Sequence, residues 1–253
     1  MNILVTNDDG YTAEGLQVLA AVLRKRHSVW IVAPSTNRSG VSHGITMSDP
    51  LRFRVEGDKE FSCSGLPVDC TITGSQGIMP FRPDVVISGI NRGANLGTDI
   101  VFSGTAAAAR QASFAGVPGI AVSLVSDTEP WYWEPLARFV SENLEQLVGL
   151  CERDVFVNIN APSLPVYRGV CMTGVSRREY RDSIVMHDGP DGCKYSFFKG
   201  GNIVTTGNGS SDWEAVEAGC VSVSRIVSQP VCAVPLPVVM SDFVLSSGTE
   251  EGV

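Results

Sequence analysis

Residues 3–10 read Ile-Leu-Val-Thr-Asn-Asp-Asp-Gly, an apolar run that ends in two adjacent carboxylates and a glycine. The apolar run predicts a buried strand, and the apolar spacing that follows it predicts a helix over residues 14–26. In open α/β sheets, ligands bind at the carboxyl ends of such strands. Asp8 and Asp9 repel each other, and a divalent cation in front of them would relieve this repulsion. The same residues also fit a polar turn and helix N-cap without a metal, so this segment alone leaves both interpretations open.

Strand-like and helix-like segments alternate through the first 160 or so residues. The apolar patterns predict further strands over 28–33, 85–88, 119–124 and 154–159, and helices over 105–115 and 134–151. This alternation is typical of an α/β fold with a mostly parallel sheet and helices on both faces. Beyond Pro162, short alternating runs such as 169–175 and 221–226 predict β-hairpin excursions instead. We therefore expect an α/β core over residues 1–162 and C-terminal hairpin segments, packed on the core, over residues 163–253.

The composition limits the class of partner. The 253 residues are 43% hydrophobic, which suffices for a substantial core, and they carry a net charge of −8. No Lys/Arg cluster suits a nucleic-acid backbone, and no apolar run approaches the roughly 18 residues that cross a bilayer, so we expect neither polymeric nucleic acid nor a membrane as partner. Seven scattered cysteines without a C-x-x-C pair, and no recognisable signal peptide, indicate reduced thiols in a cytoplasmic protein.

Four polar loops follow predicted strands, and in a parallel sheet such loops meet along one edge. They comprise residues 7–9, 34–40, 89–97 and 103–105. Taken singly, each fits an ordinary turn or helix cap. Taken together, they offer an oxygen-only ligand set that suits Mg²⁺, Mn²⁺ or Ca²⁺ rather than zinc, made of Asp8, Asp9, Ser39 and Asn91. The last loop would present amide N–H groups at a helix N-terminus, where phosphate groups bind, from Ser103, Gly104 and Thr105.

A cation beside a phosphate-binding helix indicates phosphoryl chemistry. The cation would polarise a phosphoryl oxygen and lower the pKa of a bound water, while the helix amides hold other oxygens. The sequence has no G-x-x-x-x-G-K-[ST] loop and no G-x-G-x-x-G after its first strand, which disfavours P-loop NTPases and dinucleotide dehydrogenases. Arg38 and Arg92 fit phosphate contacts and solvated loop charges equally well. His43 is interpreted either as a proton donor or, more often for such a histidine, as an ordinary solvated side chain.

Five motifs stand in fixed order along the chain: T-N-D-D-G-Y at 6–11, P-S-T-N-R-S-G at 34–40, P-L-R at 50–52, S-G-I-N-R-G-A-N-L-G at 88–97 and S-G-T-A-A-A-A at 103–109. Later segments, N-I-N-A-P at 158–162, S-D-W at 211–213 and V-S-V at 221–223, add to them. Together these motifs closely resemble the stationary-phase survival protein SurE family. Members of that family are metal-dependent nucleoside monophosphate phosphatases.

The resemblance implies a Rossmann-like catalytic core with Asp8 and Asp9 as catalytic residues. It implies that Mg²⁺ or Mn²⁺ is held by Asp8, Asp9, Ser39 and Asn91. Contacts to phosphate or substrate would come from Asn37, Arg38, Asn95, Ser103, Gly104 and Thr105. It also implies a homodimer or homotetramer in which C-terminal oligomerisation segments are exchanged. The chain departs from the family pattern at Cys220, at residues 225–227 and in the tail from Val231, and these departures leave the expected metal ligands unchanged.

We therefore expect hydrolysis of nucleoside 5′- or 3′-monophosphates to nucleoside and phosphate. A broad acid phosphatase or exopolyphosphatase is one alternative, although the net charge of −8 makes long polyanions less suitable substrates. A nucleotide-binding module without turnover is the other alternative. The residues leave open whether one of Asp8 and Asp9 acts as a general base or as the nucleophile.

Overall fold

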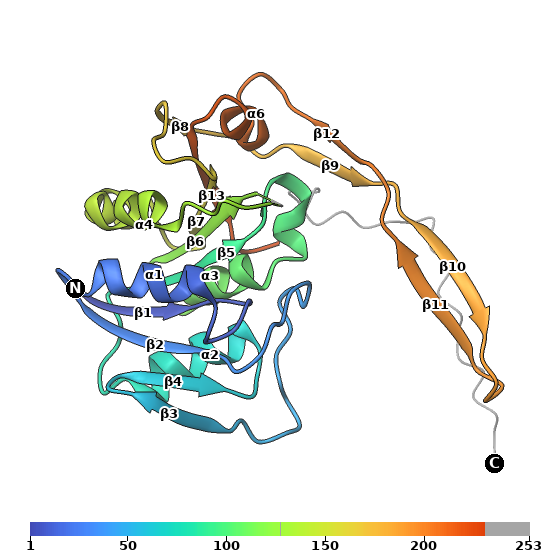
Figure 1. Cartoon of the computed structure of the whole chain (residues 1–253). Helices are drawn as coiled ribbons and strands as arrows, with labels where there is room; N and C mark the ends of the chain where they lie inside the picture. Colours follow the sequence, from blue (N-terminus) through green and yellow to red (C-terminus); the bar gives the residue numbers. More distant parts are fainter. Residues whose placement is uncertain (127, 231–253) are drawn as a thin grey trace, which may run out of the picture.

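β1 (Asn2–Thr6) lies near the centre of a nine-stranded sheet in the computed structural model, which describes residues 1–126 and 128–230 (Figure 1). The strand order is β3 (Phe53–Gly57), β4 (Glu60–Cys63), β2 (Ser28–Pro34), β1, β5 (Val85–Arg92), β6 (Gly119–Val125), β7 (Val155–Pro162), β13 (Val221–Val227) and β8 (Val170–Met172). The strands from β4 across to β7 run parallel, whereas β3 is antiparallel to β4 and β13 to β7. Numbered along the chain, the parallel strands follow the Rossmann order 3-2-1-4-5-6, which reverses between β1 and β5. The predicted α/β fold is confirmed.

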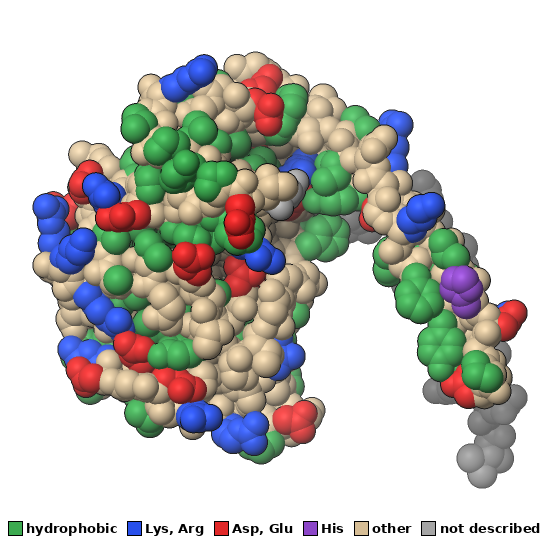
Figure 2. Space-filling view, viewed as in Figure 1, with side chains coloured by type: hydrophobic (Ala, Val, Ile, Leu, Met, Phe, Trp, Pro, Cys, Tyr) green, Lys and Arg blue, Asp and Glu red, His purple; other side chains and the backbone are tan. Residues whose placement is uncertain are grey.

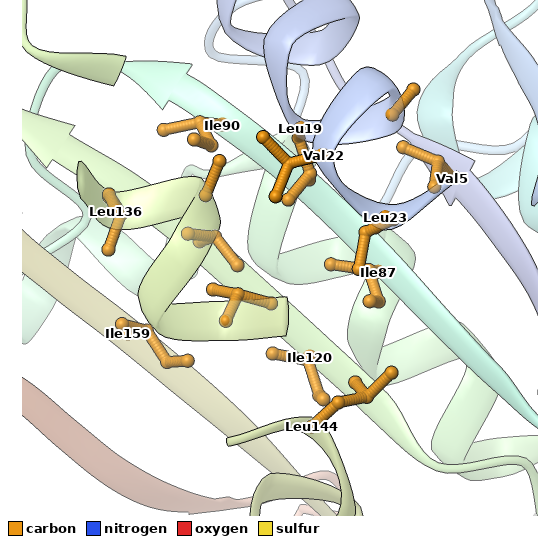
Figure 3. Close-up of a cluster of buried hydrophobic side chains, with 14 of the residues drawn as sticks. Val5, Leu19, Val22, Leu23, Ile87, Ile90, Ile120, Leu136, Leu144 and Ile159 are labelled. Atoms are coloured by element: carbon orange, nitrogen blue, oxygen red, sulfur yellow. The ribbon is translucent and has the colours of Figure 1, made fainter. Parts of the chain in front are cut away.

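Helices cover both faces of the sheet. α1 (Glu14–Leu23), α4 (Trp133–Glu142) and α5 (Leu144–Gly149) pack on one face, and α2 (Pro67–Thr73) and α3 (Gly104–Phe114) pack on the other. Side chains alternate along β1, so Ile3 and Val5 belong to the first apolar layer and Leu4 to the second. Figure 3 shows the first layer, in which Leu23 of α1 lies near Ile87 of β5. Because both faces are covered, the ends of the strands are left as the place where a ligand can reach the sheet.

Several predicted elements differ in extent from the observed ones. The helix predicted over 134–151 is divided into α4 and α5 at Asn143, whose side-chain amide donates to the carbonyl of Phe139 (2.8 Å) and so competes with the helical backbone bonds. β5 continues beyond the predicted end at residue 88 to Arg92, and α1 ends at Leu23. The apolar pattern also did not predict β3, β4, α2 and the π-helical turn η1 (Gly74–Ile78), which separate β2 from β5.

The C-terminal region supplies both sheet strands and hairpins. The runs 169–175 and 221–226, predicted as hairpin excursions, contain β8 and β13, which instead extend the main sheet beyond β7. The predicted hairpins are formed by β9 (Arg177–Tyr180) with β12 (Ile203–Thr206) and by β10 (Ser183–Asp188) with β11 (Lys194–Lys199). α6 (Asp212–Glu217) then returns the chain to β13. The predicted boundary after residue 162 stays a prediction, although two later strands join the core sheet.

The hairpins form an arm, residues 177–206, that extends away from the sheet (Figure 1). Every residue of β10 and β11 is exposed, and Figure 2 shows hydrophobic side chains along this part of the arm. The tail from Val231, one of the departures from the family pattern, lies outside the described residues. Within residues 1–126 and 128–230, no helix is long and apolar enough to cross a bilayer.

Candidate metal and phosphate site

The candidate site lies at the carboxyl ends of β1 and β5, where the strand order reverses. A cleft of about 580 Å³ opens there. It is lined by Asp8, Ser39, Gly40, Asn91, Arg92, Gly93, Ala94, Asn95, Asp99, Phe102, Ser103, Tyr180, Asp182 and Phe198. Four of the polar loops predicted from the sequence therefore converge on one cavity, as the carboxyl ends of parallel strands should.

A closed turn after β1 fixes the backbone that carries the two carboxylates. The side chain of buried Asn7 donates to the carbonyl of Gly10 (2.9 Å) and accepts from its N–H (3.2 Å). Gly10 has a φ of +106°, and a Cβ there would lie 3.1 Å from the carbonyl carbon of Thr36. Glycine is required at this point by both the conformation and the space. The polar turn that was the alternative interpretation of these residues is therefore present. It fixes the positions of the two carboxylates and is compatible with a bound metal.

Asp8 is almost completely buried, with 4% of its surface exposed. Its Oδ1 accepts a hydrogen bond from the Thr105 hydroxyl (2.5 Å), and its Oδ2 accepts from the Thr105 backbone N–H (3.1 Å). Burial raises the pKa of Asp8 to about 6; the Thr105 bonds oppose this rise and the charge of Asp9 adds to it. The fold therefore holds the Asp8 carboxylate in position with hydrogen bonds from Thr105, which is uncharged.

Asp9 is partly buried and is held by two neighbouring loops. Its Oδ2 accepts from the backbone N–H of Arg92 (2.9 Å), and its Oδ1 lies 3.4 Å from the donating side-chain amide of Asn37. Burial raises the pKa of Asp9, and the hydrogen bond and charge of Arg92 lower it. Asp9 lines a smaller neighbouring cavity together with Asn37 and Arg92, so the pair of carboxylates lies between this cavity and the main cleft.

Ser39 and Asn91 complete the predicted oxygen ligands from two further loops, and both line the cleft. The backbone N–H of Ser39 donates to the side chain of Asn37 (2.8 Å), which fixes the loop after β2. The side-chain nitrogen of Asn91 donates to the carbonyl of Gly93 (3.0 Å), which leaves its oxygen as the group available to a cation. The pairing of β5 with β6 shifts register just before Asn91, at Gly89, where a Cβ would lie 2.3 Å from the carbonyl oxygen of Val122.

The donor set fits a hard divalent cation such as Mg²⁺ or Mn²⁺. It offers two carboxylates, one hydroxyl and one amide oxygen, the ligand types that these ions prefer. Burial raises the pKa values of both Asp8 and Asp9, and a cation would supply the positive charge that stabilises their ionised forms. No cluster of three or more His, Cys, Asp and Glu suited to a metal occurs in the described part of the chain, so the neutral ligands Ser39 and Asn91 are essential to the interpretation.

The N-terminus of α3 forms the second half of the site. Ser103 is the N-cap, and its hydroxyl accepts from the N–H of Ala106 (3.0 Å). Gly104 packs directly on Asp8, because a Cβ at this position would lie 2.9 Å from the Cβ of Asp8. Both donors of Thr105 are bonded to Asp8, so this residue positions a predicted metal ligand in addition to belonging to the predicted phosphate loop. The backbone N–H of Ser103 donates to the carbonyl of Asp99 (3.0 Å), so the Ser103 hydroxyl and the Gly104 N–H stay the predicted phosphate contacts at the positive end of the helix.

Asn95 lines the cleft and is held by the last strand of the parallel sheet. Its backbone carbonyl accepts from the side chains of Asn158 (3.0 Å) and Asn160 (3.1 Å), and its backbone N–H donates to the Asn160 side-chain oxygen (2.9 Å). Its own side-chain nitrogen donates to Ser123 (2.8 Å). Asn158 and Asn160 are thus positioning residues. Both residues belong to the N-I-N-A-P motif at 158–162, but the motif alone does not show that their side chains bond to the backbone of Asn95.

Two residues considered as contacts or proton donors, Arg38 and His43, do not line the cleft. The guanidinium of Arg38 donates to the carbonyl of Ser64 (3.0 Å), and Arg38 is not among the residues that line the cleft. His43 is bonded to Gln111 (3.0 Å) and packs on Phe114, two turns or so along α3 from the site. Burial lowers its pKa. A direct proton transfer from His43 to the leaving group does not fit this position.

Five residues that the sequence patterns did not single out also line the cleft: Asp99, Phe102, Tyr180, Asp182 and Phe198. Tyr180 and Phe198 come from the arm, at least 75 residues beyond the predicted phosphate loop. Their apolar alternation predicted only hairpins. No spacing rule connects a hairpin to the edge of a sheet, so the aromatic side of the cleft emerges only from the three-dimensional structure.

A Rossmann-like sheet with paired carboxylates, neutral oxygen donors and a helix N-terminus at its switch point defines the class of α/β phosphohydrolases. The chain belongs to the SurE family, because the family model described as "Survival protein SurE" matches residues 3–182. It is 43% identical over 233 residues to "5'-nucleotidase SurE" of Thermosipho melanesiensis, covering 89% of this chain and 91% of the relative. It is 48% identical over 183 residues to "5'-nucleotidase SurE" of Treponema pallidum, covering 70% of this chain and 98% of the relative.

The fold is likewise similar to a solved structure of this family. The crystal structure of SurE protein from Aquifex aeolicus superimposes with a TM-score of 0.78 at 30% sequence identity. The match covers 91% of this chain and 95% of that chain. The resemblance stated from the motifs is therefore confirmed at the level of family and fold.

Proposed function

We propose that the protein is a metal-dependent 5′-nucleotidase that hydrolyses nucleoside 5′- and 3′-monophosphates to nucleoside and phosphate. The observation that carries this proposal is the pairing of Asp8 with Thr105, which joins a buried carboxylate to the first turn of α3. Relatives named 5′-nucleotidase SurE, which match most of the chain, support the same activity. They do not favour an exopolyphosphatase or a module without turnover.

Each part of the site has a role in this reaction. Asp8, Asp9, Ser39 and Asn91 would hold a divalent cation, which would supply Lewis acidity toward the phosphoryl group. The Ser103 hydroxyl and the Gly104 N–H hold phosphate oxygens at the helix N-terminus, and Asn95 lines the same cleft from the loop after β5. Asp8 and Asp9 are the catalytic carboxylates: one of them acts either as the general base that takes a proton from the attacking water or as the nucleophile that attacks phosphorus. The preorganised bonds from Thr105, Arg92 and Asn37 keep these carboxylates oriented before substrate arrives.

Phosphate release from a panel of substrates tests the proposal directly. We expect activity on nucleoside monophosphates with Mg²⁺ or Mn²⁺, little activity on short polyphosphate, and loss of activity with EDTA that returns when the metal is added back. Asp9→Asn should lower kcat/KM by at least about 100-fold, because it removes one ligand charge beside the reacting group. Asp49→Asn, a change at an exposed aspartate outside the cleft lining, is the matched control. Full turnover by Asp9→Asn, or activity indifferent to the chelator, contradicts the mechanism.

We also propose that the arm binds a second copy of this chain in a homodimer or homotetramer with exchanged C-terminal segments. β10 and β11 are exposed on both faces, with Ile184 opposite Phe198 on one face and Val185 opposite Phe197 on the other. An isolated two-stranded hairpin is marginally stable in water, and exposed apolar surface of this kind marks an interface. Exchange of arms would cover the face that carries Val185 and Phe197.

Light scattering coupled to size-exclusion chromatography measures this association. The double variant Val185→Ser with Phe197→Ser should shift the protein toward monomer. Val55→Ser, which changes an exposed valine on the edge strand β3, should leave the mass unchanged. A monomeric wild-type protein, or an unchanged mass for the double variant, contradicts the proposal.

A cytoplasmic location is proposed on the cysteine content. The six cysteines in residues 1–126 and 128–230 are free, as expected for a reducing compartment. Fractionation of cells that express the full chain tests it, and recovery outside the cytoplasmic fraction contradicts it.

A further inference from the structure

The lining of the cleft includes three aromatic rings beside two acidic side chains, Asp99 and Asp182. Phe102, Tyr180 and Phe198 all line it, and their exposed fractions are 55%, 46% and 79%. Phe102 directly precedes the N-cap of α3, whereas the other two rings come from the arm. Open aromatic surface of this size is unfavourable in water and becomes favourable when another flat ring covers it.

Tyr180 is fixed in place by two charged groups. Its hydroxyl donates to Oδ1 of Asp99 (2.5 Å), and Arg178 bonds the other oxygen of the same carboxylate (2.6 Å). The Arg178 guanidinium lies over the Tyr180 ring, 6.0 Å from its centroid. The ring therefore has a fixed edge and one face next to a cation, while the residue lines the cleft and stays 46% exposed.

Asp99 also connects this ring to the phosphate loop. Its backbone carbonyl accepts from the N–H groups of Phe102 (2.9 Å) and Ser103 (3.0 Å), while its side chain holds Tyr180 and Arg178. The spacing between the α3 N-terminus and the Tyr180 ring is thus determined by one buried residue. A ligand with a phosphate at one end and a flat ring at the other would offer one group to each of these two parts of the same cleft.

We infer that Tyr180 and Phe198 form a stacking wall for the nucleobase, with Asp99 as the positioning residue that holds Tyr180. This inference rests on the proposed nucleotidase function and adds the part of the substrate that is recognised beyond the phosphate. Stacking contacts the π face that every base has, so the wall accepts purines and pyrimidines alike. It rejects phosphomonoesters without a ring by failing to bind their leaving group.

The ratio of kcat/KM for AMP to kcat/KM for ribose 5-phosphate isolates the contribution of the base. Wild type should favour AMP by at least about tenfold, and Tyr180→Ala should lower the ratio about tenfold, mainly through the KM for AMP, which corresponds to about 1.4 kcal/mol. Tyr180→Phe keeps the ring and loses only the bond to Asp99, so its ratio should fall less than threefold or so. Phe198→Ala tests the second ring without touching the Asp99 bonds and should also lower the ratio.

Phe81→Ala is the control, because Phe81 is an exposed aromatic residue of the loop before β5, outside the arm, and does not line the cleft. It should leave the ratio unchanged. A ratio near one for wild type, an unchanged ratio in both Tyr180→Ala and Phe198→Ala, or an equal fall in Phe81→Ala overturns the stacking wall. Failure of wild type to release phosphate from either substrate instead overturns the proposed function itself.

Discussion

Thr105 donates two hydrogen bonds to one carboxylate, from its hydroxyl to Oδ1 of Asp8 (2.5 Å) and from its backbone N–H to Oδ2 (3.1 Å). The carboxylate at the end of β1 and the first turn of α3 are therefore one rigid unit. A cation bound at Asp8 and a phosphate bound at the helix N-terminus would be placed relative to each other before either arrives.

Thr105→Val should weaken metal binding, because it removes the hydroxyl that orients Asp8 and opposes the rise in its pKa. Loss of such an orienting partner typically costs about 10- to 100-fold in metal affinity. We expect at least tenfold weaker Mn²⁺ binding by titration calorimetry at pH 7.5. Thr105→Ser retains the hydroxyl and serves as the control with near wild-type affinity. Equal affinity for all three proteins contradicts a positioning role for Thr105.

Metal binding should weaken with acidification because protons compete for Asp8. With a pKa of about 6, this carboxyl is mostly ionised at pH 7.5 and mostly protonated at pH 5. Below pH 6 the apparent Mn²⁺ association constant should fall about tenfold per pH unit, and the raised pKa of Asp9 makes the fall steeper. Calorimetric titrations between pH 5 and 7.5 measure it. A constant affinity across that range contradicts the assignment of Asp8 as a ligand.

The metal-free protein should be stabilised by Asp8→Asn at neutral pH. The folded pKa of Asp8, about 6, exceeds the ordinary value of 3.8, so its contribution to stability is fully present below pH 3.8 and is lost as pH rises through 6. At pH 7.5 in EDTA the ionised carboxylate therefore destabilises the fold by on the order of 3 kcal/mol, and the variant should recover part of this. Urea unfolding at pH 7.5 and pH 4 gives the comparison. A difference between the two proteins that does not shrink at pH 4 refutes the linkage.

The pair of carboxylates could be predicted from the sequence because its signal is local. An apolar run that ends in Asp8 and Asp9 identifies a strand end, and the Rossmann order then brings β5 and its Asn91 next to it. The N-cap at Ser103 is equally local, since a hydroxyl residue precedes an alanine-rich helix. These inferences needed only residue type and spacing.

The rest of the cleft depends on contacts between distant parts of the chain. The hydroxyl of Tyr180 bonds to Asp99, which lies 81 residues earlier, and no residue pattern within β9 predicts this hydrogen bond. The alternating valines and serines of β13 fit a hairpin strand and a strand of the main sheet equally well, and only the pairing of β13 with β7 decides between them. The break at Asn143 was missed because the apolar spacing of α4 continues into α5, whereas the break comes from a side-chain bond to the backbone.

Gly104→Ala should abolish most activity while leaving the fold intact. The added Cβ would lie 2.9 Å from the Cβ of Asp8, 3.0 Å from its Oδ2 and 3.1 Å from Cγ of Pro67, so Asp8 or the start of α3 must move. A displacement near 1 Å at a catalytic group costs about 100-fold, and we expect kcat/KM for AMP to fall by that factor.

Gly149→Ala, also a helical glycine, has nothing within 4 Å of the added Cβ and is the matched control. It should keep full activity and gain up to about 1 kcal/mol in the free energy of unfolding, because alanine lowers the conformational entropy of the unfolded chain. Steady-state kinetics and urea unfolding of both variants separate the two effects. If Gly104→Ala retains wild-type kcat/KM, then close packing of α3 on Asp8 is not needed for catalysis. That result would contradict the claim that the rigid unit of Asp8 and Thr105 positions the cation and the phosphate.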